Sequence, residues 1–77
     1  MTDNYDTELD TSGLDCPLPI LRLKQALKGM ESGQRVRMFA TDSGSQSDVP
    51  AFCAQTGHTL IDAQVEAERF IFIVQKR

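Results

Sequence analysis

The sequence has few of the residues on which metal and disulfide chemistry depend. It contains two cysteines and one histidine in 77 residues. Two cysteines do not form a disulfide framework, and Cys16, Cys53 and His58 lack the spacing of a zinc site. No glycine-rich phosphate loop is present. The sequence therefore predicts no metal site and no bound cofactor.

Long hydrophobic runs are also missing. No apolar run approaches the roughly 20 residues that span a membrane. The acidic N-terminus has neither the positive region nor the apolar core of a signal peptide. We therefore expect a cytoplasmic protein with free thiols and no membrane partner. The length predicts one domain over residues 1–77, with residues 1–4 disordered.

Positive charge is scarce but unevenly distributed. The net charge is −3, yet residues 16–37 hold five basic residues against one acid. Three of them, Arg22, Lys24 and Lys28, fall on the first predicted helix. They form either an ordinary solvated face or a docking patch for an acidic partner. Because the whole chain is acidic and poor in aromatic residues, direct nucleic-acid binding is not expected.

Periodicity predicts six elements. Strands are expected over residues 5–11, 35–41, 58–66 and 70–75, and helices over residues 17–28 and 48–56. The first helix has a single apolar stripe. The second should follow Ser47 as its N-cap, carry Pro50 in its first turn and stop at Gly57.

The order β-α-β-α-β-β predicts an α+β fold. We expect a two-layer sandwich with both helices on one face of a four-stranded mixed sheet. The first two strands should form a right-handed parallel crossover. The nearly continuous apolar strand 70–75 should be central. Ala63 and Val65 are expected to point inward, and Phe39 to lie on the partly exposed opposite face.

Cys16 is the strongest candidate for a functional residue. It opens the sequence Cys-Pro-Leu-Pro at the start of the first helix. If Cys16 is the N-cap, its sulfur lies beside unpaired amides, with Leu18 and Ile20 as candidate donors. The helix dipole there favours a thiolate, which is the reactive form. We therefore expect the pKa of Cys16 to lie modestly below that of a model thiol.

The neighbours of Cys16 present it to solvent. Pro17 and Pro19 fix the backbone, and Gly13 and Asp15 belong to the turn between strand and helix. Asp15 opposes ionisation of the thiol by like-charge repulsion. Such turns lie at the carboxyl edge of a sheet, where open α/β proteins place their chemistry.

Three further residues have two interpretations each. Asp42 begins the loop on the same edge as Cys16, and either forms part of a partner surface or caps its own turn. Cys53 is better interpreted as a buried structural thiol than as a second reactive thiol. His58 is better interpreted as packing at a strand start than as an acid–base group.

Several motifs together resemble those of the TusA/SirA-like sulfur-carrier family, nearest its TusA branch. They are Gly-Leu-Asp-Cys-Pro-Leu-Pro at residues 13–19, Ala-Thr-Asp-Ser-Gly-Ser at 40–45, Asp-Val-Pro-Ala-Phe-Cys at 48–53 and Thr-Gly-His at 56–58. The resemblance covers about residues 5–77. Ser43 departs from the pattern, because many relatives have proline there.

This resemblance implies a sulfurtransferase with the β-α-β-α-β-β fold. Cys16 would accept sulfane sulfur as a persulfide from a cysteine desulfurase and pass it to a downstream acceptor protein. In the best-known branch the product is 2-thiolated wobble uridine in tRNA. Arg22, Lys24, Lys28 and Asp42 are the candidate partner-binding residues.

Two other function classes remain. One is a non-catalytic module whose basic first helix binds a protein or an RNA. The other is thiol–disulfide exchange, which is disfavoured because position 19 is proline rather than the second cysteine of a Cys-x-x-Cys pair.

Overall fold

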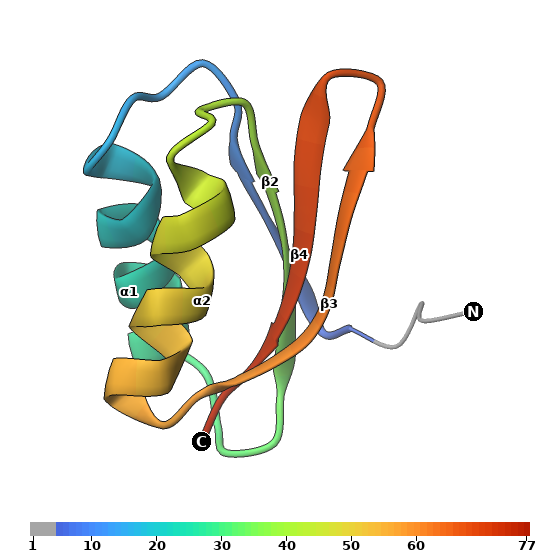
Figure 1. Ribbon diagram of the computed structural model, residues 1–77. Helices are drawn as coiled ribbons and strands as arrows, with labels where there is room; N and C mark the ends of the chain where they lie inside the picture. The colour runs from blue at the N-terminus through green and yellow to red at the C-terminus, as the bar shows by residue number, and fades with distance from the viewer. Residues whose placement is uncertain (1–4) are drawn as a thin grey trace.

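A computed structural model describes residues 5–77, so the expectation about residues 1–4 lies outside the described residues. Six elements follow one another along the chain. They are β1 (Thr7–Thr11), α1 (Leu18–Lys28), β2 (Arg35–Ala40), α2 (Ser45–Thr56), β3 (Thr59–Glu66) and β4 (Arg69–Gln75). Both helices cover the same face of the sheet, while the other face has no helix over it (Figure 1). The two-layer α+β fold predicted from the sequence is confirmed.

The four strands lie in the order β1-β2-β4-β3. The first two are parallel, joined by α1, and the remaining pairs are antiparallel. A parallel pair needs a long crossover, and the helical segment between residues 11 and 35 provides it. The prediction that the apolar strand near the C-terminus is central is confirmed, because β4 lies between β2 and β3.

The core lies between the two helices and the middle of the sheet. Leu23 of α1 and Val49 of α2 are fully buried against Val36, Met38 and Val74. Burial of each such side chain contributes about 1.5–3 kcal/mol relative to exposure. This packing fixes the first turns of α1 and α2 relative to each other.

The beginnings of the helices differ from the prediction. The first helix starts at Leu18 rather than residue 17, and Pro17 is its N-cap. The second starts at Ser45, three residues early, because the Gly44 carbonyl already accepts the Asp48 amide at 2.9 Å. Pro50 therefore lies beyond the first turn, where its missing N–H leaves one carbonyl of the preceding turn without its helical donor.

One burial prediction for β3 was wrong. Ala63 is exposed, and Val65 is 65% exposed. Ala63 is paired with the buried Phe72 of β4, and with Val65 lines a shallow hollow beside Gln46 of α2. These side chains point toward the helical layer as expected. They remain exposed because β3 is the edge strand and α2 does not extend over its far end.

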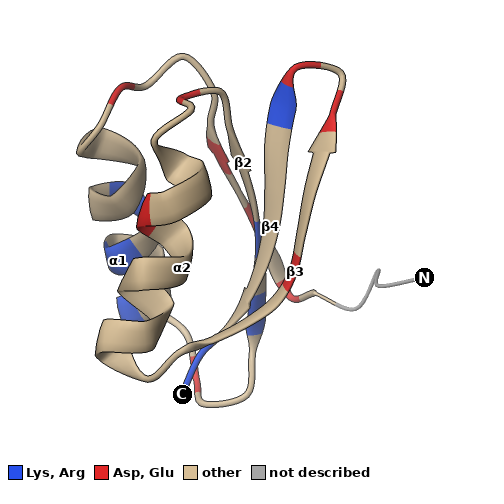
Figure 2. Ribbon diagram, viewed as in Figure 1, with Lys and Arg blue, Asp and Glu red and all other residues tan. Residues whose placement is uncertain are grey.

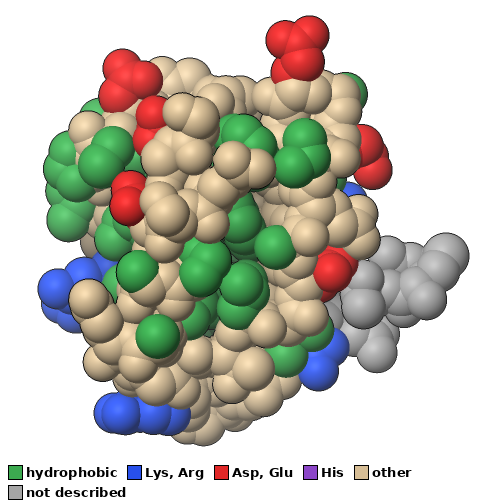
Figure 3. Space-filling model, viewed as in Figure 1, with side chains coloured by type: hydrophobic (Ala, Val, Ile, Leu, Met, Phe, Trp, Pro, Cys, Tyr) green, Lys and Arg blue, Asp and Glu red, His purple; other side chains and the backbone are tan. Residues whose placement is uncertain are grey.

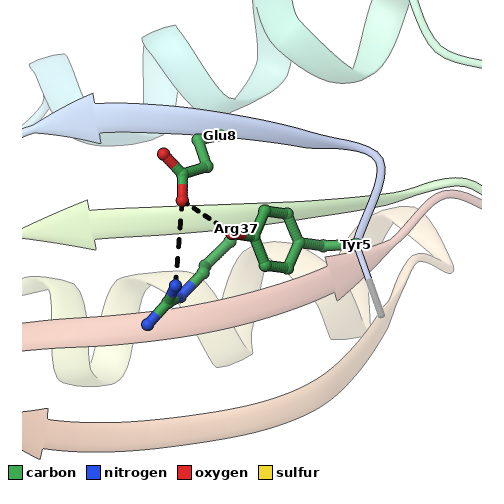
Figure 4. Close-up of polar contacts among 3 residues, drawn as sticks. All are labelled: Tyr5, Glu8 and Arg37. Carbon is green, nitrogen blue, oxygen red and sulfur yellow. Dashed lines mark hydrogen bonds and ion pairs between the residues drawn. The ribbon is translucent and has the colours of Figure 1, made fainter. Parts of the chain in front are cut away.

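The helix-free face is covered by its own side chains. The Arg37 guanidinium lies over the rings of Tyr5 (5.4 Å) and Phe39 (5.1 Å), and Arg69 lies over Phe39 at 4.4 Å. Glu8 accepts a hydrogen bond from the Tyr5 hydroxyl at 2.9 Å and pairs with Arg37 at 3.7 Å (Figure 4). Phe39 is half-buried on this face, as predicted.

No helix within residues 5–77 is both long and apolar enough to cross a membrane.

Candidate functional site

The site lies at the edge where the two parallel strands end. Because β1 and β2 run in the same direction, their following loops meet there. The Gly13 amide donates to Thr41 Oγ1 at 2.8 Å, which ties the two loops together. Gly13 has φ +80°, a left-handed conformation that most side chains disfavour. This turn leads the chain outward to Cys16.

Cys16 is exposed, but it is not the N-cap of α1. That position belongs to Pro17, whose carbonyl accepts the Leu21 amide at 3.1 Å. The Leu18 amide donates to the Asp15 carbonyl at 2.8 Å. The expectation that the Leu18 amide donates a hydrogen bond to the Cys16 sulfur was therefore wrong. Pro19, in contrast, is buried and anchors the start of the helix from within.

The sulfur faces the other helix instead. Cys16 Sγ donates a hydrogen bond to Asp48 Oδ2 of α2 at 3.4 Å. This bond to Asp48 raises the pKa of the Cys16 thiol most, followed by partial desolvation and the negative charges of Asp48 and Asp42. The predicted lowering of this pKa was wrong, because carboxylates rather than amide donors surround the sulfur. Asp48 and Asp42 supply like-charge repulsion.

An open hollow lies between the helices beside the thiol. Its volume is about 320 Å³. The lining residues are Cys16, Pro17, Ile20, Asp48, Ala51, Phe52 and Gln55. In the first turns of α1, Leu18 and Leu21 are 44% and 47% exposed. Figure 3 shows hydrophobic side chains gathered over the first turns of α1, at the left of the view. The thiol therefore lies beside an apolar rim that is open to a visiting protein.

A second hollow continues along the same pair of helices. It measures about 190 Å³ and shares Phe52 with the first. Lys24 and Lys28 of α1 line it together with Lys76 from the chain end. Blue segments along α1 in Figure 2 mark this basic stretch. Arg22 is exposed on α1 but is not among the residues that line either hollow.

Cys53 has the buried position that the sequence predicted. Its side chain is 4% exposed within the core, and burial raises the pKa of its thiol. Neither cysteine forms a disulfide. Cys53 thus packs as a small apolar residue.

His58 packs at the end of α2, as predicted for a strand start. Its ring stacks on Phe52 at a centroid distance of 5.7 Å, and its Nδ1 accepts the Arg77 amide at 3.1 Å. Desolvation lowers the pKa of His58, and the charges of Arg77 and Lys76 act in the same direction.

Asp48 is the residue of the site that sequence reasoning missed. It lies 32 positions from Cys16, and the expected element bounds made it only the first residue of a helix. A signal was nevertheless available. In a β-α-β-α order with parallel strands, both helices begin at the same edge of the sheet, so an acid in the first turn of α2 lies near the start of α1.

No three histidine, cysteine or carboxylate side chains within residues 5–77 gather as a group that could hold a metal ion.

Comparison with known proteins gives a consistent result for this arrangement. The model of the family described as "Sulfurtransferase TusA" matches residues 7–76, nearly the whole chain. This protein belongs to that family. The sulfur carrier protein TusA of Allochromatium vinosum is 49% identical over 73 residues, covering 95% of this chain and 96% of the relative. The TusA of Pseudomonas aeruginosa is 34% identical over 77 residues, covering 100% and 98%.

The fold has a counterpart among solved structures. The crystal structure of a SirA-like protein from Desulfitobacterium hafniense superimposes with a TM-score of 0.76 at 21% identity, covering 94% of this chain and 100% of that one. Family membership supports a sulfur-carrier role and sulfur transfer in general. The resemblance of the motifs at residues 13–19 and 40–58 to this family is therefore confirmed.

Proposed function

We propose that the protein is a sulfurtransferase whose Cys16 accepts sulfane sulfur from a cysteine desulfurase and holds it as a persulfide. The observation that carries the proposal is the exposed Cys16 thiol at the sheet edge, beside an open hollow between α1 and α2. A relay thiol must be reached by two proteins in turn, first the donor and then the acceptor, and this position permits both approaches. The carried persulfide is the only reactive group required, so no bound cofactor enters the proposal.

The transfer is balanced without any outside oxidant. The Cys16 thiolate attacks the outer sulfur of the donor's protonated persulfide, and a new S–S bond forms on Cys16. The S–S bond of the donor breaks, and its electron pair leaves with the donor's cysteine as a thiolate. The proton that Cys16 lost goes to that thiolate. The same step, with Cys16 as the donor, delivers sulfur to the acceptor.

The basic hollow supports a docking role for α1. Neither Lys24 nor Lys28 forms an ion pair with another residue of the range 5–77. The walls they share with Phe52 and Leu27 are largely apolar. We propose that an acidic segment of a partner binds at this basic hollow between α1 and α2. Its carboxylates would lie near the lysines, and an apolar side chain would enter the hollow.

The acceptor that we propose is a carrier protein of a relay for 2-thiolation of the tRNA wobble uridine, in the cytoplasm and without direct contact between this chain and RNA. A deletion strain tests it. Loss of thiolated wobble uridine, restored by the wild-type gene but not by Cys16→Ser, is the expected result. Normal thiolation in the deletion strain would place the carrier in another sulfur pathway.

Sulfur acceptance itself is testable with purified protein. After incubation with a cysteine desulfurase and cysteine, mass spectrometry should find one added sulfur on Cys16 of the wild type and none on Cys16→Ser. Cys53→Ala is the matched control, because it removes the other thiol and should still be loaded. A wild-type protein that binds the desulfurase but gains no sulfur would favour the alternative of a non-catalytic interaction module, which the lysine-rimmed hollow also suits.

A further inference from the structure

A carboxylate in contact with the relay thiol is unexpected, because the thiolate is the nucleophile. Asp48 Oδ2 lies 3.4 Å from Cys16 Sγ, and of the described residues that line the hollow beside the thiol it alone carries a charge. It comes from the first turn of α2, whose position is fixed by the buried neighbour Val49. The contact is thus built into the packing of the two helices.

We propose that Asp48 is a positioning residue that turns the Cys16 sulfur toward α2 and holds it as a protonated thiol while the carrier is free. The inference rests on the proposed sulfur-carrier function and adds the control of its nucleophile. Formation of the thiolate then requires a donor or acceptor protein to break the Sγ–Oδ2 hydrogen bond.

The charged groups near the Cys16 sulfur act in one direction, against ionisation of the thiol. From α2, Asp48 bears on the sulfur both through the hydrogen bond and through its charge, and Asp42 adds its charge from the loop after β2. On α1, the basic residues Lys24 and Lys28 line the other hollow rather than this one. None of the influences on the thiol favours its ionisation. A free carrier with this arrangement reacts slowly with stray electrophiles and oxidants, because only its small thiolate fraction reacts.

For sulfur transfer, the proposal implies an order of events: the hydrogen bond between Cys16 and Asp48 breaks before the S–S exchange begins. In the free carrier the proton stays on Sγ, shared with Asp48. When a partner enters the hollow and takes the carboxylate as its own hydrogen-bond or ion-pair acceptor, the thiol loses its proton to water. The S–S exchange described above follows, and the leaving thiolate of the donor takes up a proton in turn. Asp48 ends the cycle unchanged, as a carboxylate. Specificity therefore depends on two conditions. A protein must be able to reach the thiol, and its binding must allow the thiol to ionise.

The test compares Asp48→Asn with wild type, using the free carrier and no partner. Asn preserves the size and polarity of the side chain and removes the charge. The pH dependence of thiolate absorbance and the pH dependence of the rate of Cys16 alkylation by iodoacetamide should both shift to lower pH. Each unit of downward shift raises the thiolate fraction at neutral pH about tenfold. Glu31→Gln is the control, because it removes one exposed carboxylate beyond the opposite end of α1 and should leave both curves unchanged.

A second variant protects the test against misfolding. Asp48→Ser also removes the charge but retains a polar side chain with an oxygen, and it should shift the titration in the same direction. A purely structural role for Asp48 would alter the urea midpoint and leave the Cys16 titration where it is. Folded Asn and Ser variants whose titrations coincide with wild type, or move upward, overturn the proposal. That result leaves sulfur loading of Cys16 untouched, since loading is measured separately.

Discussion

At the scale of single residues, the site depends on which atoms surround one sulfur. The sequence predicted Cys16 and its exposed turn, because Cys-Pro-Leu-Pro follows a polar, glycine-containing turn and occurs together with the motifs at residues 40–45 and 48–53. It predicted the wrong direction for the shift of the Cys16 pKa, which is raised rather than lowered. Local reasoning considered the amides and the helix dipole at the start of α1 and the neighbouring Asp15, whereas Asp48, from a different helix, accepts the hydrogen bond from the sulfur. A contact between residues 32 positions apart depends on tertiary packing rather than on local pattern.

His58 allows a prediction about pH and stability. Its pKa is lowered in the folded state by desolvation and by Arg77 and Lys76, from an ordinary value of 6.5. The folded state therefore binds this proton less readily than the unfolded state does. The stabilising contribution is present above the ordinary pKa and is lost as the pH falls through the lowered one. Urea unfolding between about pH 7 and pH 5 should show the free energy of unfolding decreasing over this window.

The matched variant is His58→Asn, whose amide oxygen can take over the hydrogen bond from the Arg77 amide. It has no group that titrates in this window, and His58 is the single histidine of the chain. The decrease in stability toward pH 5 should therefore become smaller in the variant. An identical decrease in both proteins would assign the effect to the carboxylates.

At the scale of elements, the helices and strands were largely predictable, and the start of α2 was not. The apolar spacing of Leu23 and Leu27 fixes α1, and the alternation of Val36 and Met38 fixes β2. The start of α2 lacked such a pattern. Its first turn is polar, and its serines suit a cap or a helix equally well, so the position of Gly44 as N-cap emerged only from the folded chain.

The end of α2 gives a prediction about a single glycine. Gly57 has φ +86°, and a Cβ there would lie 2.8 Å from Arg77 Cδ. Gly57→Ala should lower the free energy of unfolding by about 1–2 kcal/mol, because a left-handed L-residue is strained. Gly29→Ala, at the end of α1, is the control. There φ is −86° and the nearest atom to an added Cβ is at 3.8 Å, so its effect should be much smaller.

Urea denaturation of the two variants beside wild type measures the difference. Equal losses in both would show that the backbone conformation at Gly57 is not the cause.

At the scale of the whole molecule, charge is unevenly distributed. The chain carries −3 overall, while the groove between α1 and α2 ends in a hollow rimmed by Lys24, Lys28 and Lys76. The uneven charge was visible in the sequence. The hollow was not, because Lys76 comes from the other end of the chain and reaches α1 only through the fold.

The proposed docking of an acidic segment predicts a kinetic effect. Lys28→Gln should slow association with the desulfurase or the acceptor by several-fold and weaken its dependence on salt, because one attractive charge is lost. Arg69→Gln is the control, since Arg69 lies over Phe39 on the helix-free face and its loss changes the net charge equally. Association rates measured at low and high salt distinguish the two variants. Equal effects of both would show that net charge, not the groove, governs the encounter.

The strand order has a consequence for biosynthesis. Among residues 5–77, β4 is the fourth strand along the sequence, yet it lies between β2 and β3 and is the only strand paired with β3. A nascent chain that has emerged only as far as Glu68 can pair β1 with β2, but it has no neighbour for β3 and no cover for one side of β2. The chain must therefore emerge from the ribosome as far as β4 before this sheet closes, and until then the helices lack the complete sheet against which Cys16 and Asp48 are brought together.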